Sequence, residues 1–264
     1  MQKNTVKERL KAGECVYGTS LEDCLDPEMA IVLAAAGLDF FFIDTEHCTA
    51  SYAQIQQLCR AGRSAGIVPM VRIPQNEPHL LTRTADMGPM GIIVPRVHSA
   101  ELAKAAIELL KFPPLGHRGF GLRTTITDLH PAPASEQVES CNRESMVVLM
   151  IESEQGLAAV EEIAAVPGVD ALFIGPYDLT LSLGIIEQFD NPIFWQAVDR
   201  VFKAAAQNGI AAGLQTRNMD LLLEARKRGG RFLMFSSDTG VLFDGYKKAM
   251  AKLKAAVSDR RASY

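Results

Sequence analysis

Four apolar runs in this chain are each followed, within a few residues, by side chains that carry charge or exchange protons. These side chains are Asp44, Glu46, His47, Arg72, Glu152 and Asp178. Carboxylates bind hard divalent cations, a guanidinium stabilises developing negative charge, and an imidazole moves protons near neutral pH. Together they would support chemistry at a carbonyl group, provided that the fold brings them to one place.

Glu152 and Asp178 are the candidate metal ligands. Both offer hard oxygen donors, which suit Mg²⁺ or Mn²⁺ and leave coordination positions open for water and substrate. No cysteine ends an expected strand and only one histidine is well placed, so a structural zinc site is disfavoured. A cation here would hold a 2-oxo acid by its carboxylate and keto oxygens, polarise the carbonyl and acidify the neighbouring C–H bond.

Arg72, His47 and Asp44 are the candidate catalytic residues. Arg72 would hydrogen-bond the developing enolate oxygen, while His47, oriented by Asp44 or Glu46, would transfer protons. Structural roles are open to the same residues, since Asp178 can cap the helix that follows it and Arg72 can pair with Asp44 across neighbouring strands. The functional interpretation is favoured because unpaired charges gathered at a partly buried rim are costly.

Runs rich in Val, Ile and Phe recur along the chain, each followed by a turn signal and a stretch with helical spacing. They predict eight strands, at Val16–Ser20, Phe40–Asp44, Val68–Ile73, Gly91–Pro95, Met146–Glu152, Ala171–Gly175, Ala211–Gln215 and Phe232–Ser236. The alternation is typical of parallel strands covered by helices.

Helical spacing is found between and after these strands, and in a leader helix at about Thr5–Ala12. The other predicted helices are Pro27–Ala36, Tyr52–Ala65, His79–Met87, Ala100–Leu110, Gly156–Val166, Leu179–Leu183, Ile193–Asn208, Met219–Lys227 and Gly240–Val257. Ser99 is placed to cap the helix after it, and Gly37, Gly66 and Gly209 are placed to end theirs.

Eight strand and helix units without a composition break predict one (β/α)₈ TIM barrel as a single domain over residues 1–264, because an open doubly wound sheet has about six strands. Barrel sites lie at the carboxyl ends of the strands, where the six candidate residues fall. Two long connections, 111–145 and 184–192, predict a function or an interface. The first holds basic side chains that form either an anion-binding rim or a solvated face: Lys111, His117, Arg118 and Arg123.

Composition limits the partners and the location. The chain has 27 Lys and Arg against 31 Asp and Glu, so it lacks the basic excess that a nucleic acid partner requires. The longest uncharged apolar run, 29–38, is half of the roughly 20 residues that cross a membrane. The five scattered cysteines and the polar N-terminus, without a signal-peptide pattern, predict a cytoplasmic protein with reduced thiols.

The chain resembles the HpcH/HpaI family of metal-dependent class II pyruvate aldolases, which includes 4-hydroxy-2-oxoheptanedioate aldolase. The resemblance runs from about Leu10 to Met250. Its most specific segments are residues 43–47 (IDTEH), 71–74 (VRIP), 113–119 (PPLGHRG), 151–153 (IES), and 175–179 (GPYDL) with 182–184 (SLG).

The resemblance implies roles for these residues. Glu152 and Asp178 would hold a divalent cation (Mg²⁺, Mn²⁺ or Co²⁺), and Arg72 would stabilise the pyruvate enolate. His47 with Asp44 would act as an acid–base pair through water. The supporting and substrate-facing positions would be Glu46 at the water shell of the metal, Gly175, Pro176 and Tyr177 at the substrate carboxylate, and Asp86 near a subunit interface. The family also implies a homohexamer of dimers whose last helix packs on a neighbouring subunit.

Two departures leave the substrate open. Tyr177 stands where the family often has a small residue, and Met150 where well-known members have glutamine. We expect reversible cleavage of a 4-hydroxy-2-oxo acid to pyruvate and an aldehyde. The alternatives are a relative that decarboxylates oxaloacetate or condenses it to citrate, a citryl or malyl thioester lyase, and a non-catalytic barrel that binds a dicarboxylate.

Overall fold

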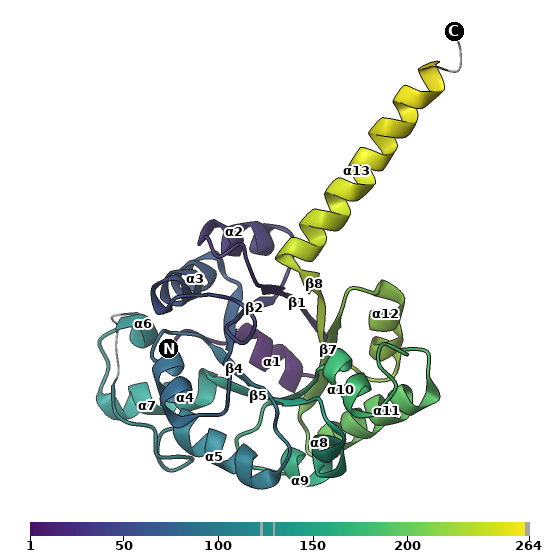
Figure 1. The fold of residues 1–264 in the computed structure, drawn as a ribbon. Coiled ribbons are helices and arrows are strands. Elements are labelled where there is room, and N and C mark those ends of the chain that lie inside the picture. The colour runs from purple at the N-terminus through teal and green to yellow at the C-terminus, as the bar shows by residue number, and fades with distance from the viewer. Residues whose placement is uncertain (122–123, 129, 262–264) are drawn as a thin grey trace.

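Eight parallel strands form a closed barrel in chain order, with β1 paired to β8, in a computed structural model that describes residues 1–121, 124–128 and 130–261 (Figure 1). The strands are β1 Val16–Leu21, β2 Phe40–Asp44, β3 Val68–Arg72, β4 Gly91–Val94, β5 Met146–Ile151, β6 Ala171–Ile174, β7 Ala211–Thr216 and β8 Phe232–Ser237. The predicted TIM barrel is confirmed. Each predicted strand starts at the observed residue and ends within one residue of the observed end.

Helices precede and follow the strands along the chain, and most of them cover the outside of the barrel. They are α1 Thr5–Lys11, α2 Glu28–Ala35, α3 Tyr52–Ala65, α4 Pro78–Ala85, α5 Ala100–Leu110, α6 Thr124–Thr127, α7 Ala134–Glu144, α8 Glu154–Ala158, α9 Val160–Ala164, α10 Pro176–Ser182, α11 Pro192–Gln207, α12 Met219–Lys227 and α13 Asp238–Arg261. The predicted helix caps are present. The Ser99 hydroxyl accepts the Leu102 N–H, and Gly37, Gly66 and Gly209 adopt positive φ at helix ends. Within the described residues, no helix is long and apolar enough to cross a membrane.

Two predictions of local structure were wrong. The predicted helix at Gly156–Val166 is two short helices, α8 and α9, and the Ala158 carbonyl at the break accepts a hydrogen bond from Arg200 of α11 at 3.0 Å. The connection 111–145, expected as a loop, contains α6 and α7. Only Cys141 of α7 is buried, with Val138 partly buried beside it, so few apolar residues mark this helix in the sequence.

The barrel interior is filled by side chains that point inward from alternate strand positions. Phe40 and Phe232 stack with ring centroids 4.5 Å apart, while Phe41, one residue along β2, packs into the outer core under the helices. Val6 and Leu10 of α1 join the inner cluster and close the amino-terminal end of the barrel. The carboxyl ends of the strands are therefore the end at which a pocket can form.

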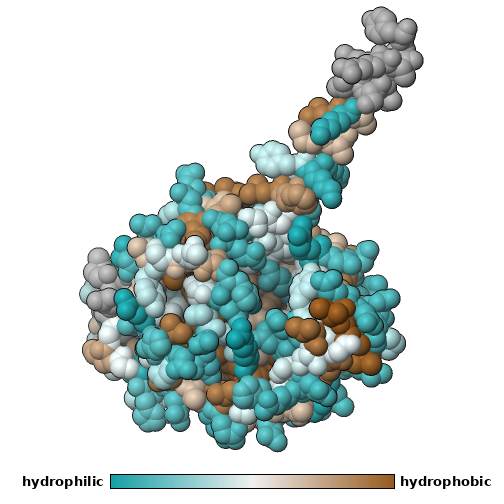
Figure 2. Space-filling view, in the orientation of Figure 1, coloured by the Kyte–Doolittle hydropathy of each residue, from teal (hydrophilic) through white to brown (hydrophobic). Residues whose placement is uncertain are grey.

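The last helix, α13, runs away from the barrel (Figure 1). Residues 241–256 are all exposed, and Figure 2 shows hydrophobic side chains on the surface of this helix. Its large exposed apolar side chains are Val241, Leu242, Phe243, Tyr246, Met250 and Leu253. Apolar side chains gathered on one helix are normally buried against another protein surface, and those of α13 are exposed within this chain.

Candidate active site

Arg72 and Asp44 form a two-pronged ion pair at the carboxyl ends of β3 and β2. The two residues are register partners, and Arg72 donates from Nε to Asp44 Oδ1 at 3.0 Å and from Nη2 to Oδ2 at 2.5 Å. Asp44 is buried, and its Oδ1 also accepts the Glu46 N–H at 2.9 Å. Burial opposes the charge on Arg72, but the hydrogen bonds and charge of Asp44 raise its pKa above the ordinary value. The guanidinium is thus fixed in its charged form at the barrel mouth.

Glu46 lies between two arginines. Its carboxylate is 3.4 Å from Arg72 and 2.7 Å from Arg96, and its side chain is almost fully buried. His47 is exposed, and its Nε2 lies 4.0 Å from Glu46. Asp44 Oδ1 accepts a hydrogen bond from the backbone N–H of His47 at 3.4 Å. None of the described contacts joins this carboxylate to the imidazole ring. Of the two partners predicted for the His47 ring, the structure brings Glu46 close to it.

Glu152 directly follows β5 and is 7% exposed. Its Oε1 accepts the backbone N–H of Arg96 at 2.5 Å. Burial is the main cause that raises the Glu152 pKa to about 7, and the charges of Asp178 and Glu46 add to it, whereas the Arg96 N–H and Arg72 oppose it. A neighbouring cation would stabilise the ionised form of this buried carboxylate.

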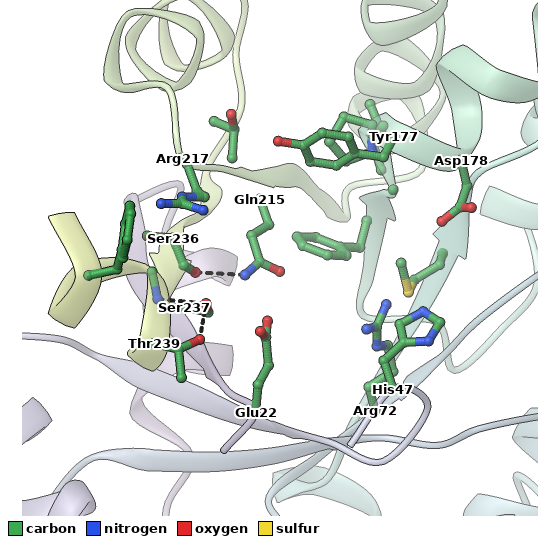
Figure 3. A pocket seen from close by; sticks show the side chains of 18 residues that line it. Glu22, His47, Arg72, Tyr177, Asp178, Gln215, Arg217, Ser236, Ser237 and Thr239 are labelled. Carbon is green, nitrogen blue, oxygen red and sulfur yellow. Dashed lines mark hydrogen bonds between the residues drawn. The ribbon is translucent and has the colours of Figure 1, made fainter. Parts of the chain in front are cut away.

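Gly175 makes the position of Glu152 possible. A Cβ at Gly175 would lie 2.6 Å from Glu152 Oε2, well inside the contact distance of the two atoms. Asp178, in the first turn of α10, is exposed, and its carboxylate turns toward the pocket in Figure 3. No group of three or more His, Cys, Asp or Glu side chains with metal-binding geometry is found among the described residues. Two carboxylates without further protein ligands fit Mg²⁺ or Mn²⁺, which keep several waters.

A pocket of about 590 Å³ opens at this end of the barrel. It is lined by six of the predicted site residues: His47, Arg72, Gly175, Pro176, Tyr177 and Asp178. Asp44 is buried and bonded to Arg72, the Glu46 carboxylate lies 3.4 Å from Arg72, and Glu152 packs against Gly175. The structure therefore gathers nine of the ten predicted residues in one region, and the roles assigned to them stay predictions.

Asp86 is the tenth predicted residue and lies elsewhere. It ends α4 and accepts a hydrogen bond from the buried Arg118 at 2.8 Å. Lys111 is also buried, where its ammonium donates to the Ser145 carbonyl at 2.7 Å and burial lowers its pKa to about 7. Neither basic residue is free to form the anion-binding rim that was one interpretation of this connection. Arg123 lies outside the described residues.

Comparison with known proteins decides the family. The sequence model of the HpcH/HpaI aldolase/citrate lyase family matches residues 24–244. The chain belongs to this family. It is therefore an enzyme of the aldolase and lyase type, as the residues quoted above predicted.

Individual relatives in the HpcH/HpaI family cover nearly the whole chain. The chain is 31% identical over 262 residues to a 4-hydroxy-4-methyl-2-oxoglutarate aldolase of Hapsidospora irregularis, a match that covers 97% of each sequence. An HpcH/HpaI aldolase structure from Desulfitobacterium hafniense is 34% identical, with a TM-score of 0.89 over 94% of this chain and 96% of that one. The citrate synthase SbnG is 30% identical, with a TM-score of 0.84 over 96% and 98% of the two chains.

Sequence reasoning missed the other half of the pocket of this HpcH/HpaI protein. The missed lining residues come from β7, β8, the start of α13 and the segments that follow β1 and β7, and include Glu22, Gln215, Arg217, Ser236, Ser237 and Thr239. The available signal was their position at strand ends, which the barrel rule places at the site. Most of these side chains are hydroxyls and an amide, which do not indicate chemistry by residue type alone.

Proposed function

We propose that this chain is a divalent-metal-dependent aldolase that reversibly cleaves 4-hydroxy-2-oxo acids to pyruvate and an aldehyde. The observation that carries the proposal is the Arg72 guanidinium, fixed by Asp44 beside Glu152 in the pocket that Asp178 also lines. Membership of the aldolase/citrate lyase family supports the reaction type. The name of the Hapsidospora relative supports a 4-hydroxy-2-oxo acid as the substrate class.

Glu152 and Asp178 would hold the cation, which would supply Lewis-acid polarisation of the keto oxygen. The backbone from Gly175 to Tyr177, at the start of α10, is proposed to face the substrate carboxylate. Arg72 would donate a hydrogen bond to the same keto oxygen as negative charge develops on it. Because Asp44 already orients the guanidinium, little reorganisation is needed during the reaction.

His47 is proposed to move the proton. In the cleavage direction the C4 hydroxyl loses its proton, the C3–C4 bond breaks, and the electron pair moves to the keto oxygen, which leaves an aldehyde and the pyruvate enolate. The enolate then takes a proton at C3. The exposed His47 ring beside Glu46 would accept the first proton through water and return one in the second step.

One observation favours a second candidate, a reaction on oxaloacetate. SbnG, which is named a citrate synthase, is as similar to this chain as several aldolases. The same guanidinium would stabilise an enolate formed by decarboxylation of oxaloacetate, so the two candidates share the site and differ in the bond that breaks.

A panel of substrates separates the candidates. The purified enzyme is supplied with Mg²⁺, Mn²⁺ or Co²⁺ and offered 4-hydroxy-2-oxo acids or oxaloacetate, and pyruvate release is followed with lactate dehydrogenase. The aldolase proposal expects metal-dependent pyruvate release from the hydroxy acids that stops with excess EDTA. Turnover of oxaloacetate alone would favour the second candidate, and EDTA-resistant cleavage would contradict the metal requirement.

We also propose that the protein is a homo-oligomer in which α13 packs on a neighbouring copy. Leu242, Tyr246, Met250 and Leu253 recur at the three- and four-residue spacing of one helix face and are all exposed. A second copy of this chain would cover that face. A hexamer is the expected size from the family resemblance, and the substrates are small molecules without a nucleic acid or membrane partner.

A further inference from the structure

Arg96 follows β4 and binds two carboxylates at the barrel mouth, although the proposed enolate chemistry gives it no role. Its backbone N–H donates to Glu152 Oε1 at 2.5 Å, and its guanidinium donates to Glu46 Oε1 at 2.7 Å. Glu46 follows β2 and Glu152 follows β5, whereas Arg96 follows the strand β4 that pairs with β5. One residue therefore connects side chains from two other strand ends.

The backbone of Arg96 has φ 55°, in the left-handed region that favours glycine. Asparagine and aspartate are the other residues that adopt this region most readily, so a turn that only ended the strand would be made at lower cost by one of these three. Arginine at such a position indicates that both its side chain and its bent backbone are used. Strain of this kind gathers at functional sites.

The bend turns two successive backbone N–H groups toward β5. In an extended strand, successive N–H groups point to opposite sides. Here the Arg96 N–H donates to Glu152, and the next N–H, that of Val97, donates to the Met150 carbonyl at 3.3 Å. The Val97 carbonyl packs against α8, where a Cβ at Gly156 would lie 2.7 Å from it. Contacts with β5 and with α8 thus fix the bend, and its N–H groups form a site for an anionic oxygen.

The Arg96 N–H determines which oxygen of Glu152 is available to a cation. Oε1 is engaged by this N–H, and among the residues that the structure describes none donates a hydrogen bond to Oε2. Oε2 lies beside Gly175, directly before α10, whose first turn carries Asp178. A cation shared by Glu152 and Asp178 would therefore bind Oε2.

The ion pair with Glu46 stabilises this conformation of Arg96. The Glu46 side chain is 6% exposed and also lies 3.4 Å from Arg72, so its carboxylate is held from a second side. The Arg96 side chain is largely exposed, and its contact with Glu46 is a charge-assisted hydrogen bond. This contact offsets part of the cost of the positive φ.

We propose that Arg96 is a positioning residue for the metal site, which fixes the Glu152 carboxylate through its backbone N–H so that Oε2 faces the cation. The inference rests on the proposed metal-dependent function and adds a residue that holds a ligand without touching the cation. Loss of such a partner typically weakens metal binding by roughly ten- to a hundredfold.

Two substitutions at position 96 separate the backbone from the side chain. R96G and R96V both remove the guanidinium, so the effect of its charge on the cation is the same in both. Glycine adopts φ 55° without strain, whereas a β-branched residue strongly disfavours it, so only R96V should withdraw the N–H from Glu152. The Kd for Mn²⁺ is measured by calorimetric titration, and urea unfolding in EDTA records the stability of each variant.

E187V is the matched control. Glu187 has φ 57°, its N–H also donates to a side-chain oxygen, Thr180 Oγ1 at 3.2 Å, and the residue is exposed and outside the pocket. We expect R96V to bind Mn²⁺ about tenfold more weakly than R96G, and E187V to lose stability but keep the wild-type affinity. If R96V does not fold, R96A takes its place, because alanine also disfavours a positive φ.

Equal affinities of R96G and of R96V or R96A would overturn the inference, as would a loss of affinity in E187V as large as that in R96V. A wild-type protein that does not bind Mn²⁺, or E152Q that binds it as tightly as the wild type, would show instead that the proposed metal site fails.

Discussion

Arg72 and Asp44 are joined by two hydrogen bonds across neighbouring strands, and the carboxylate is buried. The pair has both a structural and a chemical consequence. Because the buried Asp44 accepts two hydrogen bonds from Arg72, the direction of the guanidinium depends on Asp44, and loss of Arg72 would leave a buried carboxylate without its cation. Conversion of either residue should therefore affect stability and catalysis together.

D44N tests this dependence. The substitution keeps the size of the side chain but removes the charge that holds Arg72. We expect a loss of about 1–3 kcal/mol in the free energy of unfolding and a fall of kcat by roughly a hundredfold. Urea unfolding and steady-state kinetics on the same preparation measure both. Wild-type values of both would show that the ion pair does not position the guanidinium.

Metal binding should depend on the protonation of Glu152. Its pKa is raised to about 7, so below pH 7 a proton increasingly competes with the cation for this carboxylate. We expect the apparent Kd for Mn²⁺ to be about tenfold weaker at pH 6 than at pH 8, and E152Q to bind weakly at both. Calorimetric titration at the two pH values provides the comparison. A wild-type affinity that does not change with pH would place the metal elsewhere.

The same pKa makes a prediction for the metal-free protein. A glutamate with a folded-state pKa near 7 and an ordinary value of 4.5 binds more protons when folded, so its contribution to stability falls as the pH rises from 4.5 through 7. E152Q lacks this titration. Its stability relative to the wild type should therefore rise between pH 5 and pH 8 in EDTA, as measured by urea unfolding. A constant difference would mean that Glu152 titrates normally.

G175A should displace Glu152. The added Cβ would lie 2.6 Å from Oε2 and 3.0 Å from Cβ of the glutamate, so the buried side chain must move. We expect a loss of about 1–3 kcal/mol of stability and an affinity for Mn²⁺ at least tenfold weaker. G119A is the control, because nothing lies within 4 Å of a Cβ at that position. Equal stability and equal affinity for Mn²⁺ in the two variants would show that Gly175 is not needed to position Glu152.

The exposed face of α13 should determine the oligomeric state. M250E and L253E place charges on the apolar face that a second copy is proposed to cover, whereas K252E changes an exposed polar position of the same helix. Light scattering after size-exclusion chromatography should show smaller species for the first two variants and the wild-type mass for the third. If all three have the wild-type mass, α13 does not make the interface.

The barrel could be predicted from the sequence because its strands are short apolar runs with clear ends. Phe40–Asp44 is buried along its whole length, as a strand between an inner core and a helix layer must be. The helix α7 could not be predicted in the same way, since Cys141 is its one buried residue. The break between α8 and α9 is bound by Arg200, more than forty residues away in the chain. The spacing of residues around the break does not predict such a distant contact.

The part of the candidate site that could be predicted consists of charged residues, whose type alone indicates the chemistry they can perform. Glu152, Asp178 and Arg72 stand out as charges after apolar strands, and the fold brings them together. Ser236 and Gln215 do not stand out, because serine and glutamine are common on surfaces. They are recognised as pocket residues only because the folded chain brings the carboxyl ends of β7 and β8 to the barrel mouth.

The most direct test of the proposed enolate chemistry is proton NMR of pyruvate in D₂O with the purified protein. The methyl signal is followed with Mg²⁺, Mn²⁺ or Co²⁺ added, then with excess EDTA, and again with R72K, which retains the charge but loses the two-pronged contact with Asp44. We predict loss of the signal that requires metal, stops with EDTA and slows at least tenfold in R72K. A methyl signal that persists with metal present, or exchanges equally fast in R72K, would contradict it.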